Sequence, residues 1–205
     1  MSVAVSQRRV LYSKLAVHLG ALYPLINLYY MAFIDRLGGD PVEVVIHFTG
    51  IGALNLLLMS LLISPLAKIL NMGFLIQLRR TLGLYAFTYA TCHILNFLFF
   101  EVQFDLVLFI EEIFKRPYIT VGMTAFLFLL ALAITSTNKM RRRMRRNWQT
   151  LHNFTYLVAL LVVIHFYWSV KSEIIEPLIY LSIYGVIMGF RYRKLKDLGK
   201  KLLSR

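Results

Sequence analysis

The sequence predicts an all-α membrane protein whose single domain, residues 1–205, is a bundle of six transmembrane helices. Composition is the first observation: 59% of the residues are hydrophobic and the mean hydropathy is +0.65, values outside the range of soluble domains of this size. The second is that six apolar stretches approach the roughly 20 residues that a helix needs to cross the hydrocarbon core. The third is that most basic residues fall in clusters between those stretches.

Each predicted span is an apolar stretch bounded by polar or charged residues. In chain order, the spans are residues 10–34, 47–66, 81–100, 118–136, 148–170 and 177–190. The first follows Gln7, Arg8 and Arg9 and is too long for the core of a signal peptide, so we expect it to be retained as a helix. The last is short, and we expect it to borrow residues from its flanks.

The segments between the spans contain the turn-forming and charged residues. Residues 35–41 include two glycines and a proline, and residues 139–146 form a loop rich in arginine. The stretch 104–114 is apolar but is interrupted by three acidic residues. That pattern suits an amphipathic helix on the outer surface, so we do not expect it to span the membrane.

The distribution of charge predicts the orientation of the bundle. If the N-terminus is cytoplasmic, the inner segments hold 19 of the 23 Lys and Arg residues, whereas nine of the ten acidic residues lie outside. Basic loops resist translocation, so the topology is predicted to be N-in, C-in. This placement accounts for the net charge of +13 without a nucleic-acid partner, and the arginine loop is expected to contact anionic lipid.

Five histidines lie inside the apolar stretches or at their edges: His18, His47, His93, His152 and His165. Ionisable residues in lipid are costly and usually face the interior of a bundle. Neutral imidazole is a common axial ligand of haem iron, and helical bundles build cofactor sites from facing helices. The single cysteine excludes an intramolecular disulfide and a cysteine-ligated metal site. The pattern therefore indicates b-type haem, with a proton relay or a hydrogen-bonded helix contact as the alternatives.

Depth in the membrane decides which histidines can share one iron. At about 1.5 Å per residue, His93 and His165 lie within about 8 Å of one another in depth, both toward the outer half, and they form the first predicted pair. His152 lies near the inner edge, where His18 is the nearest histidine in depth. A second haem held by these two is a hypothesis, and a non-histidine or solvent ligand is the alternative. His47 is expected at the outer interface.

A series of short motifs runs along almost the whole chain. They are, in order, Asp40-Pro41, His47-Phe48-Thr49-Gly50, Arg79-Arg80-Thr81-Leu82-Gly83-Leu84, Ala90-Thr91-Cys92-His93, Arg116-Pro117-Tyr118, Thr135-Ser136-Thr137, Trp148-Gln149-Thr150-Leu151-His152-Asn153-Phe154 and Trp168-Ser169-Val170-Lys171. With these motifs the chain resembles the MsrQ (YedZ) family, the haem-binding membrane subunit of the periplasmic methionine sulfoxide reductase system, which is related to the transmembrane domain of ferric reductases.

The resemblance implies a site, cofactors and partners. His93, His152 and His165 match the haem-ligand positions of the family. The family takes electrons from the quinone pool of the bacterial inner membrane, can bind FMN, and passes electrons to a periplasmic molybdopterin enzyme, MsrP. Larger relatives place two histidines on each of two helices, but here Arg79 stands about 14 residues before His93. That departure leaves the ligation of an inner haem open.

The expected function is therefore a haem b electron conduit that serves a separate periplasmic reductase, with no catalytic residues of its own. The outer loops are short for a protein substrate, and no segment resembles a nucleotide-binding domain, so we expect a lipid-soluble or separately encoded electron donor. The alternatives are a self-contained transmembrane ferric or quinone reductase, and a proton-coupled transporter or scaffold without haem. No quinone or flavin motif is evident, so no residue is assigned to either ligand.

Overall fold

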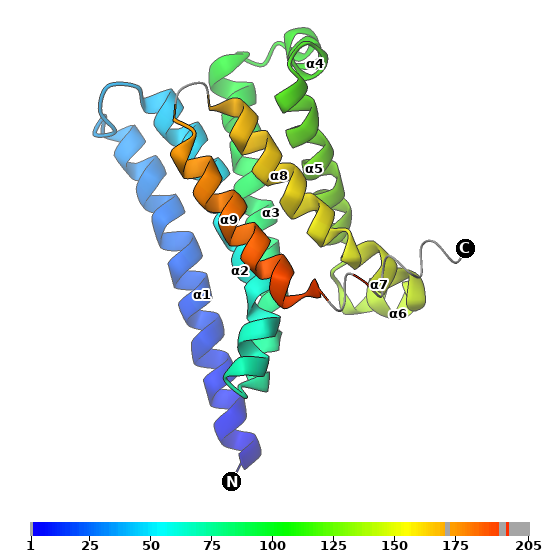
Figure 1. Cartoon of the computed structure of the whole chain (residues 1–205). Coiled ribbons are helices and arrows are strands. Elements are labelled where there is room, and N and C mark those ends of the chain that lie inside the picture. The colour runs from blue at the N-terminus through cyan, green and yellow to red at the C-terminus, as the bar shows by residue number, and fades with distance from the viewer. Residues whose placement is uncertain (1, 171–172, 193–195, 197–205) are drawn as a thin grey trace.

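A computed structural model shows an all-helical chain and describes residues 2–170, 173–192 and 196. The elements are α1 (Ser2–Phe33), α2 (Pro41–Ile69), the 3-10 helix η1 (Gly73–Gln77), α3 (Leu78–Asn96), the π-helical turn η2 (Phe97–Glu101), α4 (Leu106–Lys115), α5 (Pro117–Ile134), α6 (Asn138–Met144), α7 (Arg146–Asn153), α8 (Thr155–Ser169) and α9 (Ile175–Phe190). Figure 1 shows the long helices running side by side, with the N-terminus and the α6–α7 segment toward one end and α4 at the other.

Five helical segments of the described chain are long and apolar enough to cross a membrane. They are Gln7–Phe33, Pro41–Ile69, Gly73–Glu101, Pro117–Ile134 and Arg146–Ser169. The protein is therefore a multi-pass membrane protein. The sixth predicted span corresponds to α9, an apolar helix of 16 residues, which at helical rise covers about 24 Å of a core about 30 Å thick. A sixth crossing and the N-in, C-in orientation stay predictions.

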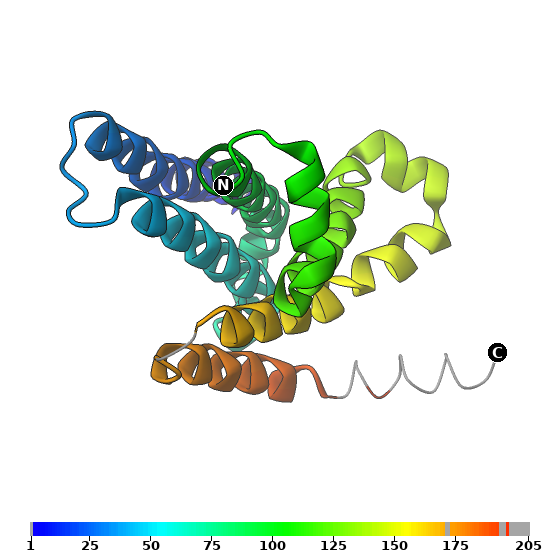
Figure 2. The same ribbon diagram turned by 90° about the horizontal axis from the view of Figure 1, so that it is seen from above.

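Two closely packed helix pairs form the centre of the bundle. α2 packs along α3, and α5 packs along α8, while α3 also contacts α5. α1 lies outside the first pair, and α9 packs against α8 and α2. Figures 1 and 2 show α1 and the α6–α7 segment on opposite sides of the bundle. One face of α3 lies close to one face of α8 inside the bundle.

The stretch 104–114, which contains three acidic residues, forms most of the separate short helix α4, as predicted. Asp105 caps α4 by accepting hydrogen bonds from the backbone N–H groups of Val107 and Leu108, both at 2.9 Å. Glu111 pairs with Lys115 at 2.6 Å. The acidic residues therefore cap and brace α4, and the helix is not among the candidate spans.

The arginine-rich segment departs from the predicted loop, because it is mostly helical. Thr137 caps α6 by accepting from the N–H of Met140 at 3.2 Å. The helix ends where Arg145 adopts a positive φ of 47°, a conformation that separates α6 from α7. The fifth predicted span, 148–170, agrees with the candidate span Arg146–Ser169, in which a division at the single residue Phe154 separates α7 from α8. His152 lies before that division and His165 after it.

A buried arginine links three helices near the end of α9. Pro65 has no N–H, so the Leu61 carbonyl of α2 lacks its usual helical partner. The guanidinium of Arg191 donates to that carbonyl and, at 2.7 Å, to the Tyr156 hydroxyl on α8. Arg191 is 7% exposed, and buried cations are tolerated only with such hydrogen bonds. The contacts tie α9 to α2 and α8.

We expect Arg191→Leu to lower the free energy of unfolding by about 1–3 kcal/mol, because the Leu61 carbonyl loses its donor inside the protein. Thermal unfolding of the detergent-solubilised chain measures the effect. Arg142→Leu on α6 is the matched control, since that arginine is exposed and should change stability by less than about 0.5 kcal/mol. Equal stability of the two variants would contradict the structural role of Arg191.

Candidate functional site

The first predicted histidine pair meets inside the bundle. His93 lies on α3 and His165 on α8, their ring centroids are 6.2 Å apart, and their ring planes are nearly perpendicular, at 85°. Both side chains are partly buried. The structure thus brings together two imidazoles that are 72 positions apart in the sequence.

Each of these imidazoles is oriented by a backbone carbonyl of the neighbouring helix. Nδ1 of His93 donates to the Ile46 carbonyl of α2 at 2.9 Å, and Nδ1 of His165 donates to the Tyr118 carbonyl of α5 at 2.7 Å. A carbonyl only accepts, so in each neutral ring Nδ1 carries the proton. The lone pair is therefore left on Nε2, the form in which histidine binds a metal.

A glycine makes room for each ring against the helix that holds it. Gly50 follows Ile46 by one turn, and a Cβ there would lie 3.1 Å from the His93 ring. Gly122 follows Tyr118 by one turn, and a Cβ there would lie 2.7 Å from His165 Nδ1. Such distances are shorter than ordinary van der Waals contact. Each histidine is thus held in the same way: a backbone carbonyl accepts a hydrogen bond from Nδ1, and a glycine four residues after that carbonyl leaves room for the ring.

This donor set fits the axial positions of a haem. A metal–imidazole bond of about 2 Å on each side of one iron places the two ring centroids roughly 6 Å apart, close to the observed 6.2 Å. Nδ1–H bonded to a carbonyl is the usual outer-shell partner of a metal-ligating histidine. Within the described residues no three His, Cys, Asp or Glu side chains gather to hold a metal.

His152 lies on α7 in different surroundings. Its ring stacks on Trp148 with centroids 3.9 Å apart, and its Nε2 lies 3.2 Å from the Thr135 hydroxyl. That hydroxyl donates to the Ala131 carbonyl at 2.7 Å, so Nε2 of His152 is the donor to Thr135 and the lone pair lies on Nδ1. His152 therefore has the opposite tautomer from His93 and His165. Its ligation of a haem stays a prediction.

His18 is not brought together with His152. His18 is exposed on α1, and its Nδ1 lies 2.6 Å from the Tyr85 hydroxyl on α3. α1 and α7 lie on opposite sides of the bundle (Figures 1 and 2). Depth along the membrane matched these two histidines, but the lateral arrangement of the helices separates them.

We expect His18→Ala to leave the haem content of the purified protein unchanged. The imidazole bonds to Tyr85 at the bundle surface, so its removal costs one exposed hydrogen bond and no ligand. Haem-to-protein ratio and the visible spectrum measure the outcome. A loss of one haem equivalent would restore the His18–His152 hypothesis.

Sequence reasoning did not find the parts of the site that orient the rings. The Ile46 and Tyr118 carbonyls have no side-chain signature. Gly50 stands in one of the short motifs, but the motif does not indicate that this glycine contacts the His93 ring. Gly122 was not singled out. In both cases the histidine follows the residue with the carbonyl by 47 positions. This equal spacing could be recognised as a signal only after the hydrogen-bonded pairs were known.

Paired imidazoles inside a multi-pass helical bundle are typical of transmembrane electron-transfer proteins. Residues 49–163, more than half of the chain, match the family described as "Ferric reductase like transmembrane component". The chain belongs to this family, and membership indicates a role in membrane electron transfer. The matched segment contains His93 and His152 and ends two residues before His165.

Proposed function

We propose that this chain is a haem b electron-transfer subunit of a bacterial inner membrane. It takes electrons from the quinone pool and passes them to a periplasmic, MsrP-like molybdopterin enzyme that reduces methionine sulfoxide in oxidised proteins. The observation that carries the proposal is the pair formed by His93 and His165, each with Nδ1 bonded to a carbonyl and Nε2 free to bind iron. The choice of partner rests on the resemblance of the motifs to the MsrQ family.

Haem bound at this site would supply a one-electron carrier inside the low-dielectric bundle. His93 and His165 would bind it, and the Ile46 and Tyr118 carbonyls hold these two imidazoles in orientation. His165 lies near the end of α8 and its anchor, Tyr118, near the start of α5, which is the predicted outer end of the bundle. Electrons at that depth are close to a periplasmic acceptor.

A second haem or an FMN would belong to the opposite end. Nε of Arg79 is buried without a hydrogen-bond partner in the described part of the chain, and the acidic side chains that the structure describes all lie outside the predicted inner segments. A propionate or phosphate group near Arg79 and His152 would compensate that charge.

The direct test uses the purified full chain. The expected result is a Soret band, reduction by a quinol, and reoxidation on adding a purified MsrP-type enzyme together with a peptide that contains methionine sulfoxide. Protein without a Soret band would overturn the haem proposal and favour a transporter or scaffold. Haem protein that is not reoxidised by the periplasmic enzyme would overturn the proposed partner.

A self-contained ferric or quinone reductase is the second candidate, and membership of the ferric reductase-like family favours it. The two candidates differ in the need for a partner. Reduction of ferric chelates or soluble quinones at equal rates with and without the periplasmic enzyme would support the second candidate. Turnover that requires the periplasmic enzyme would support the first.

A further inference from the structure

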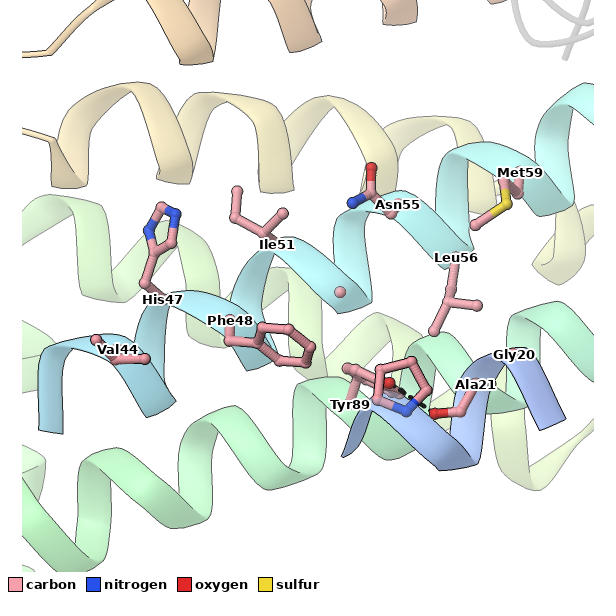
Figure 3. Close-up of a pocket in the computed structure, with 12 residues that line it drawn as sticks. Gly20, Ala21, Val44, His47, Phe48, Ile51, Asn55, Leu56, Met59 and Tyr89 are labelled. Atoms are coloured by element: carbon pink, nitrogen blue, oxygen red, sulfur yellow. Dashed lines mark hydrogen bonds between the residues drawn. The ribbon is translucent and has the colours of Figure 1, made fainter. Parts of the chain in front are cut away.

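A groove of about 370 Å³ runs along α2 between the bundle and α1. α1 contributes Gly20, Ala21 and Pro24, α3 contributes Tyr89, and α2 contributes the remaining lining residues. Figure 3 shows the α2 side chains along it, from His47 to Met59. These two positions are twelve residues apart, which is about 18 Å along a helix. The groove is therefore long, narrow and almost entirely apolar.

The groove is open on the membrane-facing surface of the bundle. Val44 and Phe48 are each 37% exposed and Met59 is 45% exposed, and all three lie on a candidate span. The apolar length of the groove therefore faces the lipid phase, which favours a lipid-soluble ligand.

The outer end of the groove is polar. Nε2 of His47 lies 3.8 Å from the Glu176 carboxylate at the start of α9, and Nδ1 of His47 has no hydrogen-bond partner among the described residues. Two turns along α2, Asn55 accepts a hydrogen bond from Tyr180 at 3.0 Å, which fastens α9 beside the groove. A lipid-soluble molecule with a hydroxyl headgroup could hydrogen-bond to His47 and lay its tail toward Met59.

The turn of α2 that contains His47 and Gly50 lies between the groove and the pair formed by His93 and His165. Gly50 contacts the His93 ring, while His47 and Ile51 line the groove, so only the α2 backbone and its side chains separate the two. That thickness is about 10 Å, one helix diameter. A redox-active headgroup beside His47 would lie next to the proposed haem site.

From this juxtaposition we propose that the groove binds a quinol, with its ring at His47 and its isoprenoid tail along α2 toward Met59. The inference rests on the proposed function, because the quinol's electrons go to haem held by His93 and His165. Oxidation of one quinol to quinone breaks two O–H bonds and releases two protons and two electrons. His47 accepts a proton at Nδ1 and passes one from Nε2 to Glu176 and the outer water, once for each hydroxyl. The first electron would reduce the ferric haem iron to ferrous iron, and the outer acceptor would reoxidise that iron before it takes the second electron, so one haem would turn over twice for each quinol.

Protons and electrons leave the quinol at the same outer end, so no charge crosses the whole membrane on the way to an outer acceptor. A quinol oxidised there would supply electrons without an inner haem.

The experiment uses the purified full chain in lipid nanodiscs with two probes, decylubiquinol as reductant and an azido-quinone as photolabel. We expect the label on peptides that line the groove, α2 residues 44–59 or α1 residues 20–24, and we expect decylubiquinol to reduce the haem. The labelling readout does not depend on turnover. Label confined to other helices would overturn the proposal.

Gly20→Leu tests the groove at a lining position where a Cβ meets no atom within 4 Å. We expect it to reduce labelling and the rate of haem reduction by decylubiquinol at least tenfold, while the Soret band and reduction by dithionite stay unchanged. The matched control is Gly185→Leu on α9, which also has open space but does not line the groove. His47→Gln should keep the label and slow the reduction.

The outcomes separate this inference from the proposed function. A wild-type chain without a Soret band would overturn both. A wild-type chain that decylubiquinol reduces, with Gly20→Leu and His47→Gln equally fast, would overturn the groove alone. Haem protein that no quinol reduces, or labelling that phospholipid competes away and unlabelled quinone does not, would also overturn it.

Discussion

Alanine at His93 or His165 is expected to abolish the six-coordinate, low-spin spectrum of the haem that we propose these two histidines hold. Each substitution removes one axial imidazole and leaves the opposite ring as the only ligand from the protein. We expect the double variant to retain less than about a tenth of the haem at this site, since even loss of an outer-shell partner costs about 10–100-fold in metal affinity. Visible spectra and the haem-to-protein ratio measure the effect.

Two controls distinguish ligation from a general loss of folding. Added imidazole can enter the space left by alanine, so it should restore the low-spin spectrum of each single variant. His18→Ala, a histidine exposed on α1, should behave like the wild type. Unchanged haem content in the double variant would show that these two rings are hydrogen-bonding partners of the helices and not iron ligands.

The spans were largely predictable because each is a local property of the sequence. The predicted span 47–66 lies inside α2, Pro41–Ile69, and 118–136 matches α5, Pro117–Ile134, to within two residues. Apolar length and a flanking proline or charge define such a helix without reference to its neighbours. The arginine segment was harder to predict, because the α6 cap at Thr137 and the positive φ of Arg145 are details of hydrogen bonding and backbone geometry.

The histidine pair was predictable in depth, and the rest of the site was not. Counting residues from the membrane edge gives height along the bundle, which matched His93 with His165 and also His152 with His18. Height says nothing of which helices are neighbours. In the structure α3 and α8 present the first pair to each other, whereas His18 bonds to Tyr85 on the α1 side of the bundle. Lateral packing of the helices, which depends on the whole chain, therefore decides which of the two predicted histidine pairs comes together.

The glycines beside the rings give the second large prediction. Gly122→Ala places a Cβ 2.7 Å from Nδ1 of His165, so the imidazole must move and its bond to the Tyr118 carbonyl is lost. We expect the haem content to fall about 10–100-fold, as for loss of other outer-shell partners of a metal-binding histidine. Haem titration of the purified variant measures the affinity.

Gly50→Ala should have a smaller effect at the equivalent position. Its Cβ would lie 3.1 Å from the His93 ring, so a movement of a few tenths of an ångström relieves the contact and can preserve the bond to Ile46. Gly185→Ala, where a Cβ meets nothing within 4 Å, is the control and should bind haem normally. The expected order of haem affinity is therefore Gly185→Ala, then Gly50→Ala, then Gly122→Ala. Equal haem affinities in all three variants would show that the space left by Gly50 and Gly122 is not needed to position the two imidazoles for haem binding.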